Sequence, residues 1–212
     1  MHLAFADIWH LQMPNANCIA VRHLPWQVLR VRWCYASSEQ VGSTSNQRIV
    51  VTDKESTVHL ADEAELVRLA ESWATSLKAA LRSRLSTEAA VMNLQGELGA
   101  GKSTLVRALL RALGYQGAVP SPTYTLIESY VLDTIRVAHA DFYRLADPSE
   151  LDFLGFDEVL AEHDLVCIEW PERALDRLPA AELLVRLEYA DKGGRQLFFS
   201  GPLAHPGGAT TL

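Results

Sequence analysis

The sequence predicts an α/β fold in three layers, with a mixed central sheet and a C-terminal β-hairpin. Two observations predict this class. Short apolar runs alternate along the chain with longer segments in which apolar residues recur at steps of three and four, as in buried strands and amphipathic helices. Near the end, two further apolar runs flank Gly193-Gly194, a pair typical of a hairpin turn. Helices that alternate with strands cover both faces of a sheet, which gives three layers.

The compact domain is expected to span residues 56–212 and to begin near Thr57. In front of it, residues 1–55 are interpreted as an N-terminal extension, either poorly ordered or the result of a start site placed too far upstream. The polar stretch 37–47 is typical of a linker. The stretch 26–35 is compatible with one strand, but a single strand has no core of its own.

The first helix is expected to begin after Asp62. Asp62 suits an N-cap position, and Glu65, three residues later, can complete a capping box. A short strand follows at 89–94, and residues 102–113 have the pattern of a second amphipathic helix that ends at Gly114. The apolar face of the first helix comprises Leu66, Leu69, Trp73, Leu77 and Leu81.

Buried strands are also predicted at 135–140 and 165–168. Between them, the segment Asp147-Pro148-Ser149-Glu150 has proline at a first helical position and a glutamate that can cap, so a helix should begin there. Residues 183–189 and 195–199 form the expected terminal hairpin.

The segment from Gly96 to Ser103, GELGAGKS, matches the phosphate-binding pattern GxxxxGK[ST] at every fixed position. Its glycines allow backbone N–H groups to point at phosphate oxygens, and the N-terminus of the following helix adds to this field. Lys102 is expected to reach the β- and γ-phosphates, and the Ser103 hydroxyl is a candidate Mg²⁺ ligand. The strand before the loop and the helix after it favour a P-loop NTPase-like domain over a chance glycine-rich turn. The expected cofactors are ATP and Mg²⁺.

Two carboxylates follow buried strands, where P-loop proteins place the residue that completes the Mg²⁺ site. Glu169 comes directly after residues 165–168 and is the candidate metal ligand. Asp141 ends the run 136–141 and is expected either to hold a metal-bound water or to orient the attacking water, with a turn cap as the structural alternative. His139 shares a face with Asp141 and is interpreted as structural.

Motifs and charge argue against some other classes of protein. The residues from Asp152 to Gly155 match the DxxG of GTPases but fall within the expected helix, and no NKxD sequence occurs. These two observations argue against a GTPase. A net charge of −7 and a pI near 5.5 argue against holding nucleic acid without a partner. The three cysteines lack metal-ligand spacing, and no apolar stretch is long enough for a membrane span, so a cytoplasmic protein is expected.

Four specific blocks occur in order along the chain: GELGAGKSTLVRALLRALGY at 96–115, SPTYTLIESY at 121–130, HADFYRLADPSELDFLGFDE at 139–158 and IEWPER at 168–173. In these blocks the chain resembles the TsaE (YjeE) family, the small bacterial ATPases of tRNA threonylcarbamoyladenosine biosynthesis. The resemblance covers about residues 57–200. The chain departs from the family pattern in two ways: serine stands at position 103, where threonine is common in the family, and residues 1–55 precede the usual start.

The resemblance implies a Mg²⁺-dependent ATPase that acts with threonylcarbamoyl-transferring proteins of the TsaD and TsaB type. It would permit their repeated turnover and meet tRNA only indirectly. The resemblance also implies Mg²⁺ ligation by Ser103 and Glu169 and a functional role for Asp141. Thr123 and Thr125 are candidate switch residues that sense the γ-phosphate, with ordinary turn hydrogen bonding as the alternative. The implied nucleotide contacts are Glu63, Leu98, Gly99, Ala100, Gly101, Lys102, Ser103, Thr104, Trp170 and Arg195.

Two other functions stay open on the residues alone. A small-molecule kinase would pass phosphate to a bound acceptor, but it needs an acceptor pocket and usually an arginine-rich lid. No such cluster follows the P-loop helix in the sequence. A nucleotide-gated binding module would bind ATP with negligible hydrolysis.

Overall fold

The computed structural model describes residues 55–204, with residues 85 and 87 excepted. The expected N-terminal extension therefore lies outside the described residues, apart from Glu55. The same holds for the expected linker at 37–47 and for the strand considered at 26–35.

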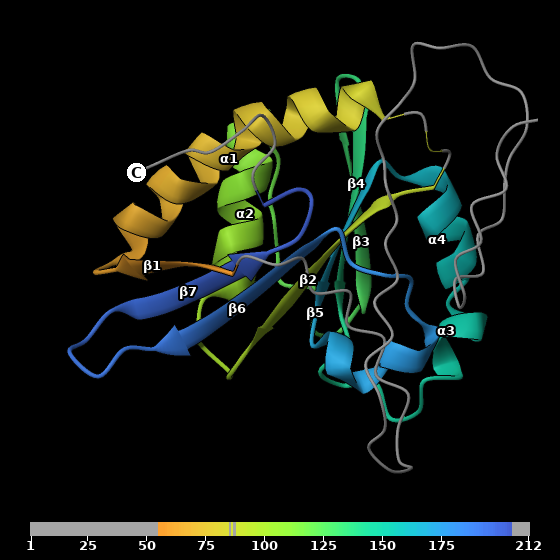
Figure 1. The fold of residues 1–212 in the computed structure, drawn as a ribbon. Coiled ribbons are helices and arrows are strands. Elements are labelled where there is room, and N and C mark those ends of the chain that lie inside the picture. Colours follow the sequence, from red (N-terminus) through yellow and green to blue (C-terminus); the bar gives the residue numbers. More distant parts are fainter. Residues whose placement is uncertain (1–54, 85, 87, 205–212) are drawn as a thin grey trace, which may run out of the picture. The chain divides into compact units, whose positions relative to one another are not determined.

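The described part forms one mixed sheet with the strand order β1-β7-β6-β2-β5-β4-β3 (Figure 1). β6, β2, β5 and β4 run parallel in its centre. β7 and β1 add antiparallel strands at one edge, and β3 adds one at the other. The predicted mixed sheet and terminal hairpin are confirmed. The strands are β1 (Ser56–Leu60), β2 (Ala90–Gly96), β3 (Ile127–Leu132), β4 (Ile135–Asp141), β5 (Leu165–Glu169), β6 (Leu183–Tyr189) and β7 (Arg195–Ser200).

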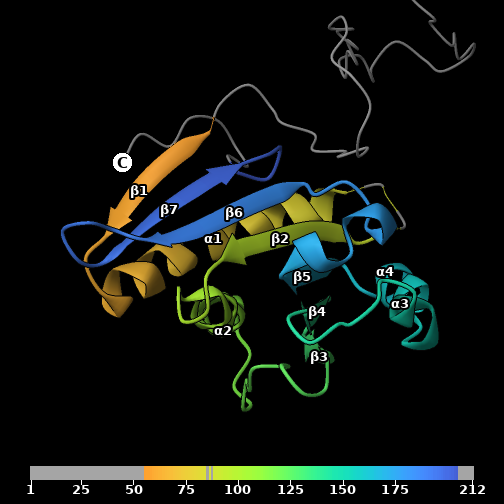
Figure 2. The same cartoon turned by 90° about the horizontal axis from the view of Figure 1, so that it is seen from below.

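Helices cover both faces of this sheet (Figure 2). Alternate residues of a strand point to opposite faces, and β2 shows this directly. Met92 packs in the core beneath α1 (Glu63–Ser83) and α2 (Lys102–Leu113), whereas Val91 packs in the core beneath α3 (Glu150–Phe153) and α4 (Phe156–Glu162). The three-layer prediction is therefore correct. None of the described helices has an apolar stretch long enough to cross a bilayer.

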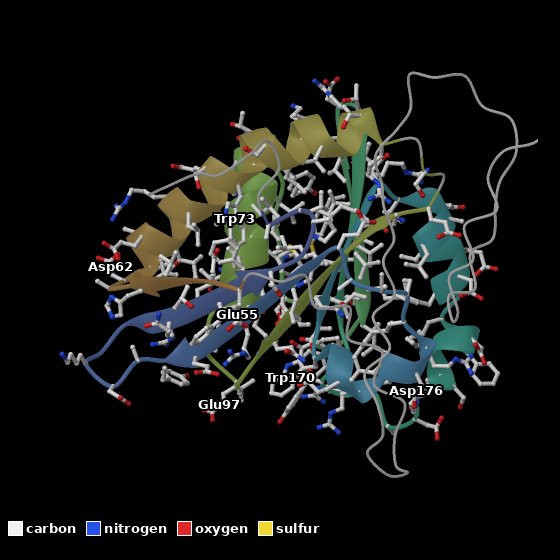
Figure 3. All side chains as sticks on the ribbon, viewed as in Figure 1. Glu55, Asp62, Trp73, Glu97, Trp170 and Asp176 are labelled. Carbon is white, nitrogen blue, oxygen red and sulfur yellow. The ribbon has the colours of Figure 1, made fainter. Side chains whose placement is uncertain are left out.

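The first helix begins as its capping residues predict. The Asp62 carboxylate accepts a hydrogen bond from the backbone N–H of Glu65 at 2.9 Å, and the Glu65 carboxylate accepts one from the N–H of Ala61 at 2.6 Å. Trp73 lies on the helix face that packs against the sheet, with its ring 5.1 Å from that of Phe199 (Figure 3). This contact fixes α1 over the hairpin.

Two parts of the fold differ from the sequence prediction. The edge strands β1 and β3 were not predicted, because half-exposed edge strands lack the continuous apolar runs of the central strands. The helix expected to begin at the Asp147–Glu150 cap is interrupted at Gly155, where the backbone turns left-handed with φ of 63°. The DxxG-like residues 152–155 therefore span the end of α3 and the break before α4.

Candidate nucleotide site

The P-loop joins the end of the central strand β2 to the start of α2. Gly96 has φ of 139°, and a Cβ at this position would lie 2.3 Å from the carbonyl oxygen of Leu187. Gly101, with φ of 113°, precedes α2 directly. A side chain is excluded at the first position and strained at the second. The loop therefore turns tightly and presents the free N–H groups of the α2 N-terminus, an arrangement suited to binding an anion.

Lys102 is the first residue of α2 and is only 4% exposed. Its Nζ donates hydrogen bonds to the carbonyl oxygens of Gly96 at 2.7 Å and Glu97 at 2.9 Å, and it lies 4.2 Å from the ring centre of Trp170. Burial lowers the pKa of Lys102, while the nearby carboxylate of Glu169 acts in the opposite direction. The ammonium group is thus held beside the loop by contacts that a phosphate can replace.

The two strand-end carboxylates lie side by side. β4 and β5 are parallel neighbours, and their register pairs Asp141 with Glu169. Both are buried, with exposed fractions of 3% and 2%. They line the same cavity as Lys102 and Ser103. Both carboxylates therefore lie beside the P-loop, and their chemical roles stay predictions. The other predicted residues that line this cavity are Leu98, Gly99, Gly101, Thr104 and Trp170.

A series of hydroxyl groups connects the P-loop serine to Asp141. Ser103 Oγ lies 3.4 Å from Ser121 Oγ, which lies 2.9 Å from Thr123 Oγ1. The Thr123 hydroxyl donates to Asp141 Oδ2 at 2.9 Å, and the backbone N–H of Tyr143 donates to Oδ1 at 3.0 Å. Both oxygens of Asp141 are thereby oriented. Of the two predicted switch threonines, Thr123 lines the cavity and the exposed Thr125 does not.

Aromatic rings border this cavity where β5 ends. Trp170 follows Glu169 with a left-handed backbone, φ of 57°. Its ring centre lies 5.0 Å from that of Tyr143. Figure 3 shows Trp170 and Glu97 at the same end of the sheet. Trp170 therefore lies beside Lys102. A phosphate chain bound there would change the surroundings of the Trp170 ring.

A second pocket lies on the other side of the P-loop and contains two residues that the resemblance alone predicted. Glu63, at the start of α1, and Arg195, at the start of β7, both line it, together with Ala100. The two pockets share Gly99, Gly101 and Thr104. They therefore meet at the P-loop.

The terminal hairpin holds the P-loop from this side. Arg195 donates to the carbonyl oxygens of Ala100 at 3.1 Å and Gly99 at 3.2 Å, and the Tyr189 hydroxyl donates to that of Leu98 at 3.0 Å. The Arg195 guanidinium lies 4.0 Å from the Tyr189 ring centre. Because C=O and the following N–H point in opposite directions in a trans peptide, these bonds turn the N–H groups of Gly99 and Gly101 away from the hairpin.

Sequence reasoning missed three contributors to the site. His139, interpreted as structural, is hydrogen-bonded to Glu169. Tyr189 and Ser121 were not considered. The alternation of side chains along the strand places His139 on the same face as Asp141, and this could have indicated that His139 lies near the site. Nothing local marked Tyr189, which is 91 residues from its partner Leu98.

The parallel centre of the sheet, the P-loop between β2 and α2 and the strand-end carboxylates together define a P-loop NTPase-like protein. Comparison with known families is more specific. The model of a family described as "Threonylcarbamoyl adenosine biosynthesis protein TsaE" matches residues 60–197. The chain belongs to the TsaE family, as the sequence blocks indicated.

Individual relatives agree with this assignment. The tRNA threonylcarbamoyladenosine biosynthesis protein TsaE of Haemophilus influenzae is 42% identical over 136 residues, which cover 64% of this chain and 83% of that protein. Its counterpart in Nostoc sp. is 36% identical over 141 residues, covering 64% and 85%. The crystal structure of Bacillus subtilis YdiB superposes with a TM-score of 0.55 at 24% identity, covering 70% of this chain and 86% of that one. This last likeness supports the fold.

Proposed function

We propose that this chain is a Mg²⁺-dependent ATPase required for N6-threonylcarbamoyladenosine modification of tRNA, where it allows the threonylcarbamoyl-transferring proteins to turn over repeatedly. The observation that carries the proposal is the single cavity that contains Lys102, Ser103, Asp141 and Glu169. Family membership supplies the pathway, since the relatives are named for threonylcarbamoyladenosine biosynthesis.

The donor atoms in the cavity suit Mg²⁺. This cation prefers oxygen ligands and retains several waters, and the Ser103 hydroxyl and the Glu169 carboxylate offer oxygen only. Within the described residues, no group of three histidine, cysteine or carboxylate side chains is arranged to hold a metal. The remaining ligands would therefore come from phosphate oxygens and water, as is usual in P-loop sites. When bound, Mg²⁺ would offset the negative charge on the β- and γ-phosphates.

Two side chains have distinct roles in the proposed hydrolysis. Lys102 exchanges its loop carbonyl partners for phosphate oxygens and stabilises the charge on the transferring phosphoryl group. Asp141 orients the attacking water, because its carboxylate is held by Thr123 and Tyr143 and retains free lone pairs. The water oxygen attacks the γ-phosphorus as the bond to the ADP oxygen breaks.

A partner completes the site in this proposal. Among the described residues, no arginine lines the cavity of Lys102 and Asp141. An arginine supplied by a partner can raise P-loop hydrolysis by about 10³–10⁵-fold. We therefore expect slow hydrolysis by the chain alone and stimulation by proteins of the TsaD and TsaB type. Because its net charge is −7, the chain is expected to contact tRNA only through these partners. It is expected to act in the cytoplasm.

The test is phosphate release measured for the chain alone, with candidate small-molecule acceptors, and with the purified transferring proteins and tRNA. Slow release that rises with the transferring proteins, together with repeated rounds of tRNA modification, is the expected result. Phosphate transfer to an acceptor would instead support a kinase. ATP binding without hydrolysis under any condition would support a nucleotide-gated binding module.

A further inference from the structure

His139 lies directly beneath the candidate Mg²⁺ site. Its side chain is fully buried in β4, and its Nε2 is 2.8 Å from Glu169 Oε1. Nδ1, the other ring nitrogen, has no hydrogen-bond partner within residues 55–204 as described. The imidazole therefore has one polar contact in this part of the chain, and that contact is with the strand-end carboxylate.

The register of the sheet produces this contact. His139 pairs with Cys167 across β4 and β5, and Glu169 follows Cys167 by two residues. Side chains two residues apart on a strand point to the same face, so the Glu169 and His139 side chains lie on one face of the sheet, where the carboxylate reaches Nε2 of the ring. Within the described part of the chain, the Glu169 side chain is hydrogen-bonded to His139.

We propose that His139 is a positioning residue for the Mg²⁺ site. Its Nε2–H holds Oε1 of Glu169 and leaves Oε2 for the metal or for a water bound to it. The inference rests on the proposed function, because it assumes that Glu169 serves Mg²⁺. A free glutamate loses rotational freedom when it binds a metal, whereas one already held by a neighbour has lost that freedom during folding.

The ring geometry permits a matched pair of variants. In His139→Gln the amide nitrogen can reach the place of Nε2 and donate to Glu169, whereas the shorter amide of His139→Asn reaches only the place of Nδ1. His163→Gln is the control. His163 is also buried, but it bonds to Val159 and Ser129 and comes just before β5, whereas Glu169 ends that strand.

The measurement is the affinity of the full chain for a fluorescent, non-hydrolysable ATP analogue, with Mg²⁺ and with EDTA. The dissociation constant in EDTA divided by that in Mg²⁺ gives the contribution of the metal to the affinity for the analogue. His139→Asn should reduce this ratio by about 10–100-fold, the usual effect of losing a partner of a metal ligand. His139→Gln should retain most of it, and His163→Gln should leave it unchanged even if thermal stability falls.

The outcomes separate the two proposals. If the wild-type chain does not bind the analogue, or binds it equally with and without Mg²⁺, the proposed function fails. If the wild-type ratio is large and folded His139→Asn retains it, the positioning role is wrong. Should His139→Asn not fold, ¹⁵N spectra of the wild-type histidines, assigned with His139→Gln, decide the question. A ring protonated at Nε2 in the Mg²⁺-nucleotide complex supports the role, and one protonated only at Nδ1 overturns it.

Discussion

The two sides of the P-loop are built differently. On the phosphate side, Lys102 begins α2 and the carboxylates of Asp141 and Glu169 end parallel strands, so the topology itself brings them together. On the hairpin side, Arg195 reaches a loop residue 95 positions away, and Glu63 comes from the start of α1. In the proposed function, the phosphate side carries the charges that act on the reacting groups. The hairpin side holds the backbone of the P-loop through hydrogen bonds to its carbonyl oxygens.

This difference separates two kinds of expected effect. Changes on the phosphate side should act on turnover or on the metal, because they alter groups at the γ-phosphate. Changes on the hairpin side should act on nucleotide affinity, because they loosen the loop before binding and leave the reacting groups in place.

The largest effect is expected for Lys102→Ala. The variant should lose hydrolysis while its fold remains intact, since it removes the positive charge nearest the transferring phosphoryl group. Loss of such a group costs about 3–4 kcal/mol in the transition state, roughly a hundredfold or more in rate. Phosphate release is the measurement, with thermal unfolding as the control. A folded variant with wild-type turnover would remove Lys102 from the mechanism.

Asp141→Asn should reduce turnover with little change in ATP affinity, because asparagine keeps the shape but not the charge that orients water. The expected cost to the activation free energy is that of losing one hydrogen bond to a charged group, about 1.5–3 kcal/mol. Initial rates at saturating ATP and direct binding measurements distinguish the two effects. A large loss of affinity in Mg²⁺ would instead place Asp141 among the metal-binding groups.

On the hairpin side, Arg195→Leu should weaken ATP binding while turnover at saturation is retained. It removes two hydrogen bonds to P-loop carbonyls, each worth about 0.5–1.5 kcal/mol. Tyr189→Phe is the matched variant. It removes one bond from a half-exposed hydroxyl and keeps the ring, so its effect should be smaller. If Arg195→Leu lowers turnover and spares affinity, the division between the two sides is wrong.

The smallest effect is expected for removal of residues 1–55, which precede β1 and the matched family region. ATP binding and thermal stability should change little, because the apolar pattern of that stretch is too irregular to share the domain core. Isothermal titration and thermal unfolding of the shortened chain test this. Unfolding or loss of ATP binding would show that the domain begins earlier than residue 56.

The same contrast explains what could be read from the sequence. Phosphate binding demands fixed spacing within the P-loop, and buried parallel strands leave continuous apolar runs. Lys102, Ser103, Asp141 and Glu169 could therefore all be proposed from the sequence. The contacts between the hairpin and the P-loop join segments far apart in the sequence, and no local pattern marks them. Arg195 and Glu63 were predicted through family resemblance alone, and Tyr189 was missed.

His139 illustrates a further limit. Alternation along β4 places it on the face of Asp141, but the bond to Glu169 depends on the register of β4 against β5. Register is set by packing over the whole sheet. The edge strands β1 and β3 were not predicted for a similar reason. They are defined by their hydrogen-bonded pairing with β7 and β4, which a local apolar pattern does not reveal.

The most direct test of the account is a crystal structure of the chain with Mg²⁺ and a non-hydrolysable ATP analogue. The central claim is that the two pockets are the ends of one nucleotide site. The γ-phosphate should lie beside Lys102 and Ser103, and the ribose and base should occupy the pocket of Glu63 and Arg195. Arg195 should still hold the P-loop carbonyls. A base bound away from that pocket, or phosphates outside the P-loop, would contradict the claim.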